Sequence, residues 1–210
     1  MIAPTWRRSI TGGRNLLGSE SLYFDSFKKS EYFKFYSSLI TDTRLLTEMK
    51  HHGYRGILCM HPTFHEHWVD FQSNEVFSIN HGYVDYQRLF VRSSLLVTDY
   101  SSIFFDFSLL GKPVVYAQFD RADYFAESTS RLGYFDHEKD GFGPVCYTLN
   151  CTVDAIIASV SDIPFFYAMI RRKKQISMPY RERRGRTSSP LSSLGIDQLI
   201  ENRFHDALPD

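Results

Sequence analysis

A cluster of hydroxyl and acidic side chains interrupts a long apolar stretch near the middle of the sequence. Directly after the run "SLLV" come Thr98, Asp99, Tyr100, Ser101 and Ser102, and Asp106 follows four residues later. A strand, a polar turn and a helix start form the unit that binds phosphates in open α/β sheets. The first N–H groups of such a helix lack partners and carry the positive end of its dipole. We therefore predict an anion site at this turn, with Ser101 and Ser102 as hydroxyl donors.

The carboxylates of this cluster need a separate explanation, because both would repel a phosphate that they faced. Asp99 and Asp106 suit hydrogen bonds from sugar or glycerol hydroxyls, or from the turn itself. The alternative is a turn without a ligand, in which Ser102 caps the helix and Asp106 favours its dipole. Both interpretations stay open at this point.

Two further residues stand at the ends of predicted strands. His61 follows the apolar run "GILCM", and Pro62 suits a helix start directly after it. A histidine there can donate to a phosphate oxygen and stabilise the charge that builds on a departing nucleotide. Arg7, in "PTWR", follows a first strand and can grip a phosphate through two parallel hydrogen bonds. The alternatives are a loop histidine satisfied locally and a surface arginine.

Two other motifs carry less information. His65 and His67 in "HPTFHEH" lack the H-E-x-x-H order, and on a helix they would point roughly opposite ways, so we expect no metal and no cofactor. Gly141 and Gly143 in "DGFGP" indicate either a flexible loop that closes over a ligand or a plain turn.

Composition excludes several classes of protein. The chain has 210 residues, enough for one substantial domain, and 24 basic residues balance 24 acidic ones. We therefore expect no nucleic-acid partner. The three cysteines have no metal spacing, which fits free thiols in a reducing, cytoplasmic compartment. No apolar run reaches the roughly 18 residues of a membrane span, and the start does not resemble a signal peptide.

Predicted strands and helices alternate along the chain with short connections. Strands are expected at 2–3, 56–60, 75–79, 94–99, 112–117 and 145–149, helices at 30–50, 85–93, 102–111, 152–162 and 164–174, and loops at 11–22 and 118–144. The helical segment 30–50 has plausible N-caps near Ser30 and Asp42. This alternation predicts an α/β domain with a parallel, Rossmann-like sheet.

The alternating pattern ends before the last 30 residues. We predict a nucleotide-donor-binding lobe over 1–178 and a divergent tail over 179–210, which is basic, then Ser/Pro-rich, with a short final helix. The run "RRKK" at 171–174 and the arginines of the tail predict a solvated face or peripheral contact with an anionic membrane. The start "MIAP" resembles a strand entered halfway, which indicates a fragment of a longer protein.

Several strings occur together in the order found in one family. The chain contains "APTWR", "MHP", "LLVTDYSSIFFDF", "GKPVVYAQFD" and "DGFGP", and over residues 3–160 it resembles the CDP-glycerol glycerophosphotransferase family. The resemblance implies a GT-B fold with two Rossmann-like halves, of which this chain is the C-terminal, donor-binding one. It implies that the donor site is lined by Arg7, Met60, His61, Ser101, Ser102 and Asp106, with His61 as the catalytic histidine.

The resemblance also implies a reaction. A hydroxyl of a polyol-phosphate or lipid-linked acceptor attacks the β-phosphate of CDP-glycerol and CMP leaves, in the synthesis of teichoic acid or a surface polysaccharide. The family's second essential histidine belongs to an N-terminal lobe that has no match here, so we expect the chain to be inactive alone. The alternatives are a transferase lobe for another nucleotide-activated sugar or polyol phosphate, and a non-catalytic nucleotide-binding partner lobe.

Overall fold

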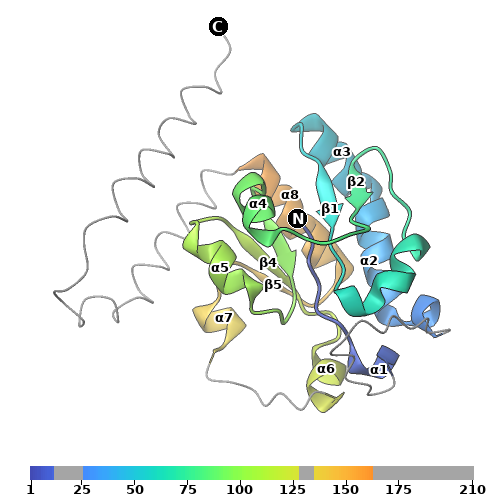
Figure 1. Ribbon diagram of the computed structural model, residues 1–210. Helices are drawn as coiled ribbons and strands as arrows, with labels where there is room; N and C mark the ends of the chain where they lie inside the picture. Colours follow the sequence, from blue (N-terminus) through green and yellow to red (C-terminus); the bar gives the residue numbers. More distant parts are fainter. Residues whose placement is uncertain (12–25, 128–134, 163–210) are drawn as a thin grey trace, which may run out of the picture. The chain divides into compact units, whose positions relative to one another are not determined.

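The computed structural model describes residues 1–11, 26–127 and 135–162 (Figure 1). The predicted loop at 11–22, apart from Thr11, and the predicted helix at 164–174 lie outside these ranges. The same holds for the tail and its boundary at 178, which stay predictions. Within the described ranges, no helix is long and apolar enough to cross a membrane.

A parallel sheet forms the centre of the molecule. Its strands are β1 (Gly56–Leu58), β2 (Phe77–Ile79), β3 (Leu96–Thr98), β4 (Val114–Ala117) and β5 (Val145–Cys146). The pairs β1 with β2, β3 with β4, and β4 with β5 are all parallel. Ile2 joins the two groups, because it forms parallel bridges to both Leu58 and Val97. The predicted parallel α/β fold is therefore confirmed.

The N-terminal segment takes the place of a strand between β1 and β3. The N–H of Ile2 donates to the carbonyl of Ile57 at 2.8 Å, and the N–H of Ala3 donates to that of Val97 at 2.9 Å. When this segment is counted as the first strand, the order across the sheet is 3-2-1-4-5-6, the order of a doubly wound Rossmann fold. The order reverses between this segment and β3, which places the switch point there.

Helices cover both faces of the sheet (Figure 1). Five of them supply buried side chains to the cores: α2 (Glu31–Thr41), α3 (Thr43–His51), α4 (Tyr86–Arg92), α5 (Ile103–Leu109) and α8 (Leu149–Ser161). The other helical elements are α1 (Arg8–Thr11), α6 (Arg121–Glu127), α7 (His137–Asp140) and the 3₁₀ segments η1 (Phe27–Lys29) and η2 (Pro62–Asp70).

Successive strand side chains point to opposite faces, so the sheet has two cores. Ile2 and Leu58 belong to the core that also contains side chains of α2, α3 and α8. Their neighbours Ala3 and Cys59 belong to the second core, with side chains of α4 and α5. Burial on both faces explains why the strands are apolar on consecutive positions.

The helical segment predicted at 30–50 is two helices, and both predicted caps are present. The hydroxyl of Ser30 accepts the N–H of Phe33 at 3.1 Å at the start of α2. The carboxylate of Asp42 accepts the N–H of Leu45 at 3.0 Å at the start of α3. Asp42 thus ends one helix and begins the next.

The segment 118–144 differs from the expected loop, because its described part contains α6 and α7. None of the described side chains of these two helices is fully buried, so the sequence has no apolar stripe at helical spacing there. For Gly141 and Gly143 the sequence left a flexible loop or a plain turn open, and the structure shows a third role for them, close packing. Both glycines are buried, and a Cβ on Gly143 would lie 1.6 Å from the carbonyl oxygen of Val114. These glycines permit close packing of the backbone on β4.

Candidate functional site

The carboxyl ends of adjacent strands bring several predicted site residues to one edge of the sheet. Leu58 and Val97 both bridge to Ile2, so Thr5, His61 and Tyr100 each stand three residues beyond a bridged position. Neighbouring strands lie about 4.8 Å apart. Ligands of doubly wound sheets bind at this edge, at the switch point. The structure therefore places His61 and the turn at 99–102 where a ligand site is expected.

Asp99 is completely buried and links the turn to the N-terminal segment. Its carboxylate accepts the N–H and the hydroxyl of Thr5 at 2.9 and 2.7 Å, and the N–H of Tyr100 at 2.6 Å. It also accepts a hydrogen bond from Arg7 at 2.8 Å. Of the explanations offered by the sequence, hydrogen bonding within the protein is the one that the structure shows for Asp99.

Arg7 is 3% exposed, and its guanidinium is held by two carboxylates. Its Nε donates to Asp120 at 2.5 Å, its Nη2 donates to Asp99 at 2.8 Å and to Asp120 at 3.2 Å, and its Nη1 donates to the carbonyl of Thr5 at 2.7 Å. Burial opposes the charge, but the two carboxylates raise the pKa of Arg7 well above its usual value. Four of its five N–H donors are thus engaged. In this structure Arg7 holds the strand ends together. Its direct contact with the nucleotide donor stays a prediction.

The hydroxyls of the turn are accessible. Ser102 is exposed at the start of α5, and its side chain makes no capping hydrogen bond. Ser101 is partly exposed, and its hydroxyl accepts the N–H of Ile103 at a long 3.5 Å. Asp106 is exposed in the first turn of α5. Simple capping therefore does not account for Ser102, and all three side chains can meet a ligand from solvent.

His61 presents one ring nitrogen as a donor. Its Nδ1 accepts the N–H of Thr63 at 3.2 Å and lies 2.9 Å from the hydroxyl of the same residue. The neutral ring therefore carries its proton on Nε2. Burial lowers the pKa of His61 below its usual value, which favours this neutral form at pH 7. The ring of Trp6 lies beside it, with 6.4 Å between ring centroids.

Met60 lies in the core and does not reach the surface, with 2% exposure. In this position it supports the strand end that carries His61. In this conformation Met60 does not reach a ligand at the surface. Its contact with the nucleotide donor stays a prediction.

The other histidines of "HPTFHEH" have structural partners. His67 is completely buried, stacks on Phe27 with 4.0 Å between ring centroids, and pairs through Nδ1 with Asp70 at 2.8 Å. His65 is exposed and packs edge-on against Trp68. Among the residues that the structure describes, no group of three or more His, Cys, Asp or Glu side chains could hold a metal ion.

Two residues after β4 were missed by the sequence reasoning. Asp120 holds Arg7 and accepts the hydroxyl of Tyr100 at 3.1 Å. Gln118 donates to the carbonyl of Asp99 at 3.2 Å, and its own side-chain oxygen is buried and lacks a hydrogen-bond partner within the described part of the chain. Polar residues directly after a buried strand were the signal at His61 and Ser101. The same signal in "VVYAQFD" would have found both.

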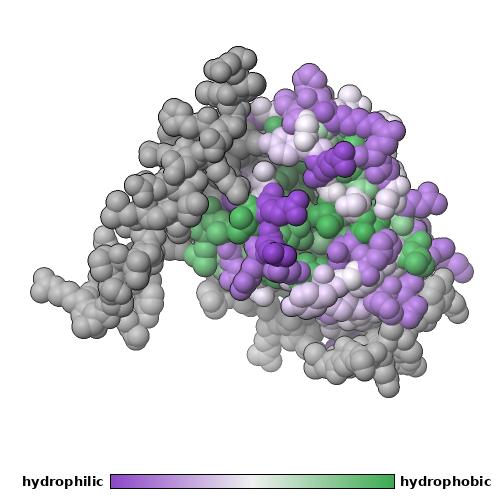
Figure 2. All heavy atoms as spheres, turned by 45° about the horizontal axis from the view of Figure 1, so that its top comes forward, coloured by the Kyte–Doolittle hydropathy of each residue, from purple (hydrophilic) through white to green (hydrophobic). Residues whose placement is uncertain are grey.

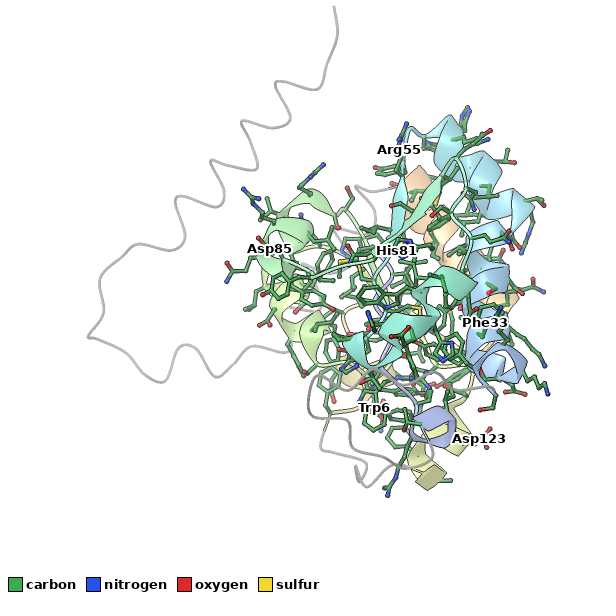
Figure 3. All side chains as sticks on the ribbon, turned by 45° about the vertical axis from the view of Figure 1, so that its right-hand side comes forward. Trp6, Phe33, Arg55, His81, Asp85 and Asp123 are labelled. Atoms are coloured by element: carbon green, nitrogen blue, oxygen red, sulfur yellow. The ribbon has the colours of Figure 1, made fainter. Side chains whose placement is uncertain are left out.

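Cavities lie at both ends of the strands. One of about 380 Å³ lies at the carboxyl ends and is lined by Arg7, Tyr32, Asp120 and Asp123, among others. Figure 3 shows Trp6 and Asp123 at this end and Arg55 at the other.

A second cavity of about 550 Å³ lies at the amino ends, between residues such as Met1, Arg55 and Leu95. Figure 2 looks toward this end, where green apolar residues occupy the middle of the face among purple polar ones. The cavity is the larger one but contains no predicted site residue, and sheets of this order bind ligands at the carboxyl ends.

Comparison with known proteins supports a family assignment. The family model described as CDP-Glycerol:Poly(glycerophosphate) glycerophosphotransferase matches residues 1–188. The minor teichoic acid biosynthesis protein GgaB of Bacillus subtilis is 36% identical over 157 residues, which cover 75% of this chain and 17% of GgaB. The teichoic acid poly(glycerol phosphate) polymerase of the same organism is 33% identical over 157 residues, which cover 74% of this chain and 18% of the polymerase.

A solved structure agrees with this assignment. A histidine variant of the wall teichoic acid polymerase TagF, soaked with CDPG, superimposes with a TM-score of 0.54 at 21% identity. The match covers 100% of this chain and 42% of TagF, which supports the predicted lobe of a GT-B-type fold. The chain thus spans less than half the length of these proteins. The matched motifs, the fold and the relatives agree with the resemblance found in the sequence, and the chain belongs to the CDP-glycerol:poly(glycerophosphate) glycerophosphotransferase family.

Proposed function

We propose that this chain is the donor-binding lobe of a transferase that moves glycerol phosphate from CDP-glycerol to an acceptor hydroxyl. The observation that carries the proposal is the convergence of His61, Ser101 and Ser102 at the switch point of a doubly wound sheet, in a member of this family. The relatives are named for teichoic acid synthesis, and the TagF variant was soaked with CDPG.

In this proposal each site residue has a defined task. The hydroxyls of Ser101 and Ser102 donate to the diphosphate, and Asp106 accepts hydrogen bonds from the glycerol hydroxyls. Nε2–H of His61 donates to the oxygen that becomes negative when CMP leaves, which stabilises that charge. Arg7 and Met60 act from behind the surface, by holding the strand ends that carry these groups.

The bond changes follow from the chemistry of the donor. The acceptor oxygen forms a bond to the β-phosphorus, the bond from that phosphorus to the bridging oxygen breaks, and CMP departs with the electron pair. Since His61 already carries its proton on Nε2, the base that removes the acceptor proton must come from elsewhere. We propose that a second, N-terminal lobe supplies it and binds the polyol-phosphate or lipid-linked acceptor. We place the reaction in the cytoplasm at the inner face of the membrane.

A second candidate is a lobe that binds another nucleotide-activated polyol phosphate or sugar. A lobe of this kind would bind the diphosphate with the same groups at the carboxyl edge. It would differ only in the residues that contact the base and the transferred unit. The two candidates therefore differ in ligand preference rather than in architecture.

Isothermal titration calorimetry of the chain with CDP-glycerol and UDP-glucose separates the two candidates. We expect tighter binding of CDP-glycerol, and about tenfold weaker binding in Ser102→Ala, since one hydrogen bond to a charged group is worth about 1.5 kcal/mol. Ser73→Ala, at an exposed serine away from the carboxyl edge, is the matched control and should bind like the parent. Equal affinity for the two nucleotides, or wild-type binding by Ser102→Ala, would contradict the proposal.

A further inference from the structure

Two of the three cysteines meet where β5 leads into α8. Cys146 ends β5 and is buried, whereas Cys151 lies in the first turn of α8 and is exposed. Their sulfur atoms are 2.6 Å apart. Thr148 caps α8 by accepting the N–H of Cys151 at 3.2 Å, so the local backbone fold holds this arrangement. We infer that Cys146 and Cys151 form a reversible disulfide, a modification site that is independent of the proposed function.

The sulfur separation favours a disulfide over a metal site. A disulfide bond is about 2.05 Å long, so a shift of about 0.6 Å brings the two sulfurs to bonding distance. Two thiolates on one tetrahedral zinc ion, each about 2.3 Å from the metal, would lie about 3.7 Å apart. The described residues also offer no third ligand near the pair.

The environments of the two thiols assign them different roles in the exchange. Cys151 is exposed in the first turn of α8, so an oxidant in solution reaches its sulfur first. Burial, reinforced by the neighbouring Cys151 sulfur, raises the pKa of Cys146 well above its usual value. Cys151 is therefore the attacking thiol, and Cys146 is the one that resolves the mixed disulfide.

The reaction balances with a low-molecular-weight disulfide as the oxidant. The Cys151 thiolate attacks one sulfur of the oxidant and releases one thiolate. Cys146 loses its proton and attacks the Cys151 sulfur, which releases the second thiolate. Two electrons pass from the protein to the oxidant, and two low-molecular-weight thiols are the products. The new bond ties the first turn of α8 to β5, beside the hydrogen bond from Gln118 to the carbonyl of Cys146.

The test incubates the whole chain in buffers of increasing glutathione disulfide to glutathione ratio, followed by alkylation in denaturant and tryptic mass mapping. Cys146 and Cys151 fall in one tryptic peptide, 140–171, whereas Cys59 falls in 56–88. We expect peptide 140–171 to carry two alkyl groups at low ratios, and at high ratios to carry none and to weigh about two mass units less than the unalkylated dithiol peptide, a change that dithiothreitol reverses. Peptide 56–88 should be alkylated on Cys59 at every ratio, since burial protects Cys59 from the oxidant until the chain is denatured.

Two variants complete the experiment. Cys151→Ser, at an exposed position, should abolish the mass loss, and Cys59→Ser should leave it unchanged. The inference is overturned if peptide 140–171 keeps two alkylatable thiols at the highest ratio. It is also overturned if Cys151 retains a glutathione adduct or if the bond joins two chains.

Discussion

Asp99 shows why a charged residue sits inside an apolar stretch. Its carboxylate is completely buried, yet backbone, hydroxyl and guanidinium donors from Thr5, Arg7 and Tyr100 surround it. Taking two charges out of water is unfavourable, so a buried ion pair persists only where further hydrogen bonds satisfy both partners. Here that network joins the first strand, β3 and Asp120 after β4. Asp99 therefore holds the strand ends together rather than contacting a ligand.

Removing the charge of Asp99 tests this role. Asp99→Asn keeps the side-chain shape but leaves the Arg7 guanidinium with one fewer carboxylate in a buried site, so we expect the free energy of unfolding to fall by about 3 kcal/mol. Asp123→Asn, at an exposed carboxylate of the cavity that Arg7 also lines, should change the free energy of unfolding by less than about 0.5 kcal/mol. Urea denaturation followed by circular dichroism measures both free energies of unfolding. Equal losses in the two variants would show that the buried ion pair contributes no more to stability than an exposed carboxylate.

The proton of His61 gives a second prediction at this scale. Burial lowers its pKa, so the folded state binds this proton at lower pH than the unfolded state does. The contribution of His61 to stability is therefore fully present above its unfolded pKa of about 6.5 and is lost as the pH falls below that value. We expect the ring to titrate with a midpoint below 6.5 in the folded chain and to show the Nε2–H tautomer by nitrogen NMR. The same ring in urea should titrate near 6.5, and His61→Gln assigns the signal. A folded midpoint above the urea value would refute this account.

Two serines at helix starts look alike in the sequence but differ in the structure. The hydroxyl of Ser30 accepts the N–H of Phe33 and caps α2, whereas Ser102 at the start of α5 makes no such bond. Helix formation thus explains Ser30 completely and leaves the hydroxyl of Ser102 free of a capping role.

Alanine substitutions at these two serines should separate stability from binding. Ser30→Ala should lower the free energy of unfolding by about 1 kcal/mol, the usual contribution of an N-cap. Ser102→Ala should lower it by less than about 0.5 kcal/mol while weakening nucleotide binding. Thermal melts of both variants, set beside their nucleotide affinities, provide the readout. A stability loss in Ser102→Ala as large as in Ser30→Ala would return Ser102 to a capping role.

Gly143 tests how α7 and β5 approach β4. A Cβ there would lie 1.6 Å from the carbonyl oxygen of Val114, which is backbone and cannot rotate away. We expect Gly143→Ala to lower the free energy of unfolding by about 3 kcal/mol through overpacking. Gly82→Ala is the matched control, because a Cβ at Gly82 meets nothing within 4 Å. Similar unfolding midpoints for the two variants in urea would show that the backbone gives way at little cost.

The elements differ in how far the sequence predicts them. Continuous apolar runs ended by polar residues predicted the strands, and side-chain oxygens in the right place predicted the caps at Ser30 and Asp42. Helices α6 and α7 were missed, because none of their described side chains is fully buried and no apolar stripe at helical spacing marks them. The pairing of Asp99 with Thr5 joins residues 94 positions apart, and no local pattern reports it. The sequence thus predicted the polar turn at the candidate site. The hydrogen bonds that hold this turn could be found only from the fold.

At the scale of the whole molecule, the parallel sheet gives the lobe two unlike ends. The carboxyl ends carry His61, the turn with Ser101 and Ser102, and the Arg7 network. The amino ends carry the larger cavity, with apolar and basic residues such as Leu95 and Arg55. Volume alone would favour the amino end. The carboxyl end is favoured by its hydrogen-bond donors, His61, Ser101 and Ser102. It is also where doubly wound sheets bind their ligands.

Hydrogen exchange with bound nucleotide decides between the ends. With CDP-glycerol at about 100 times its Kd, the folded state should gain about 2.7 kcal/mol. The largest local slowing of exchange should occur in segments 4–7, 60–63 and 99–103. Segments 53–57 and 92–95, at the amino ends, should show only the change that follows from global stabilisation. UDP-glucose at the same concentration is the control and should protect the carboxyl-end segments less. Protection centred on 53–57 and 92–95 would instead place the nucleotide in the larger cavity, and the carboxyl edge would then lose its assignment as the donor site.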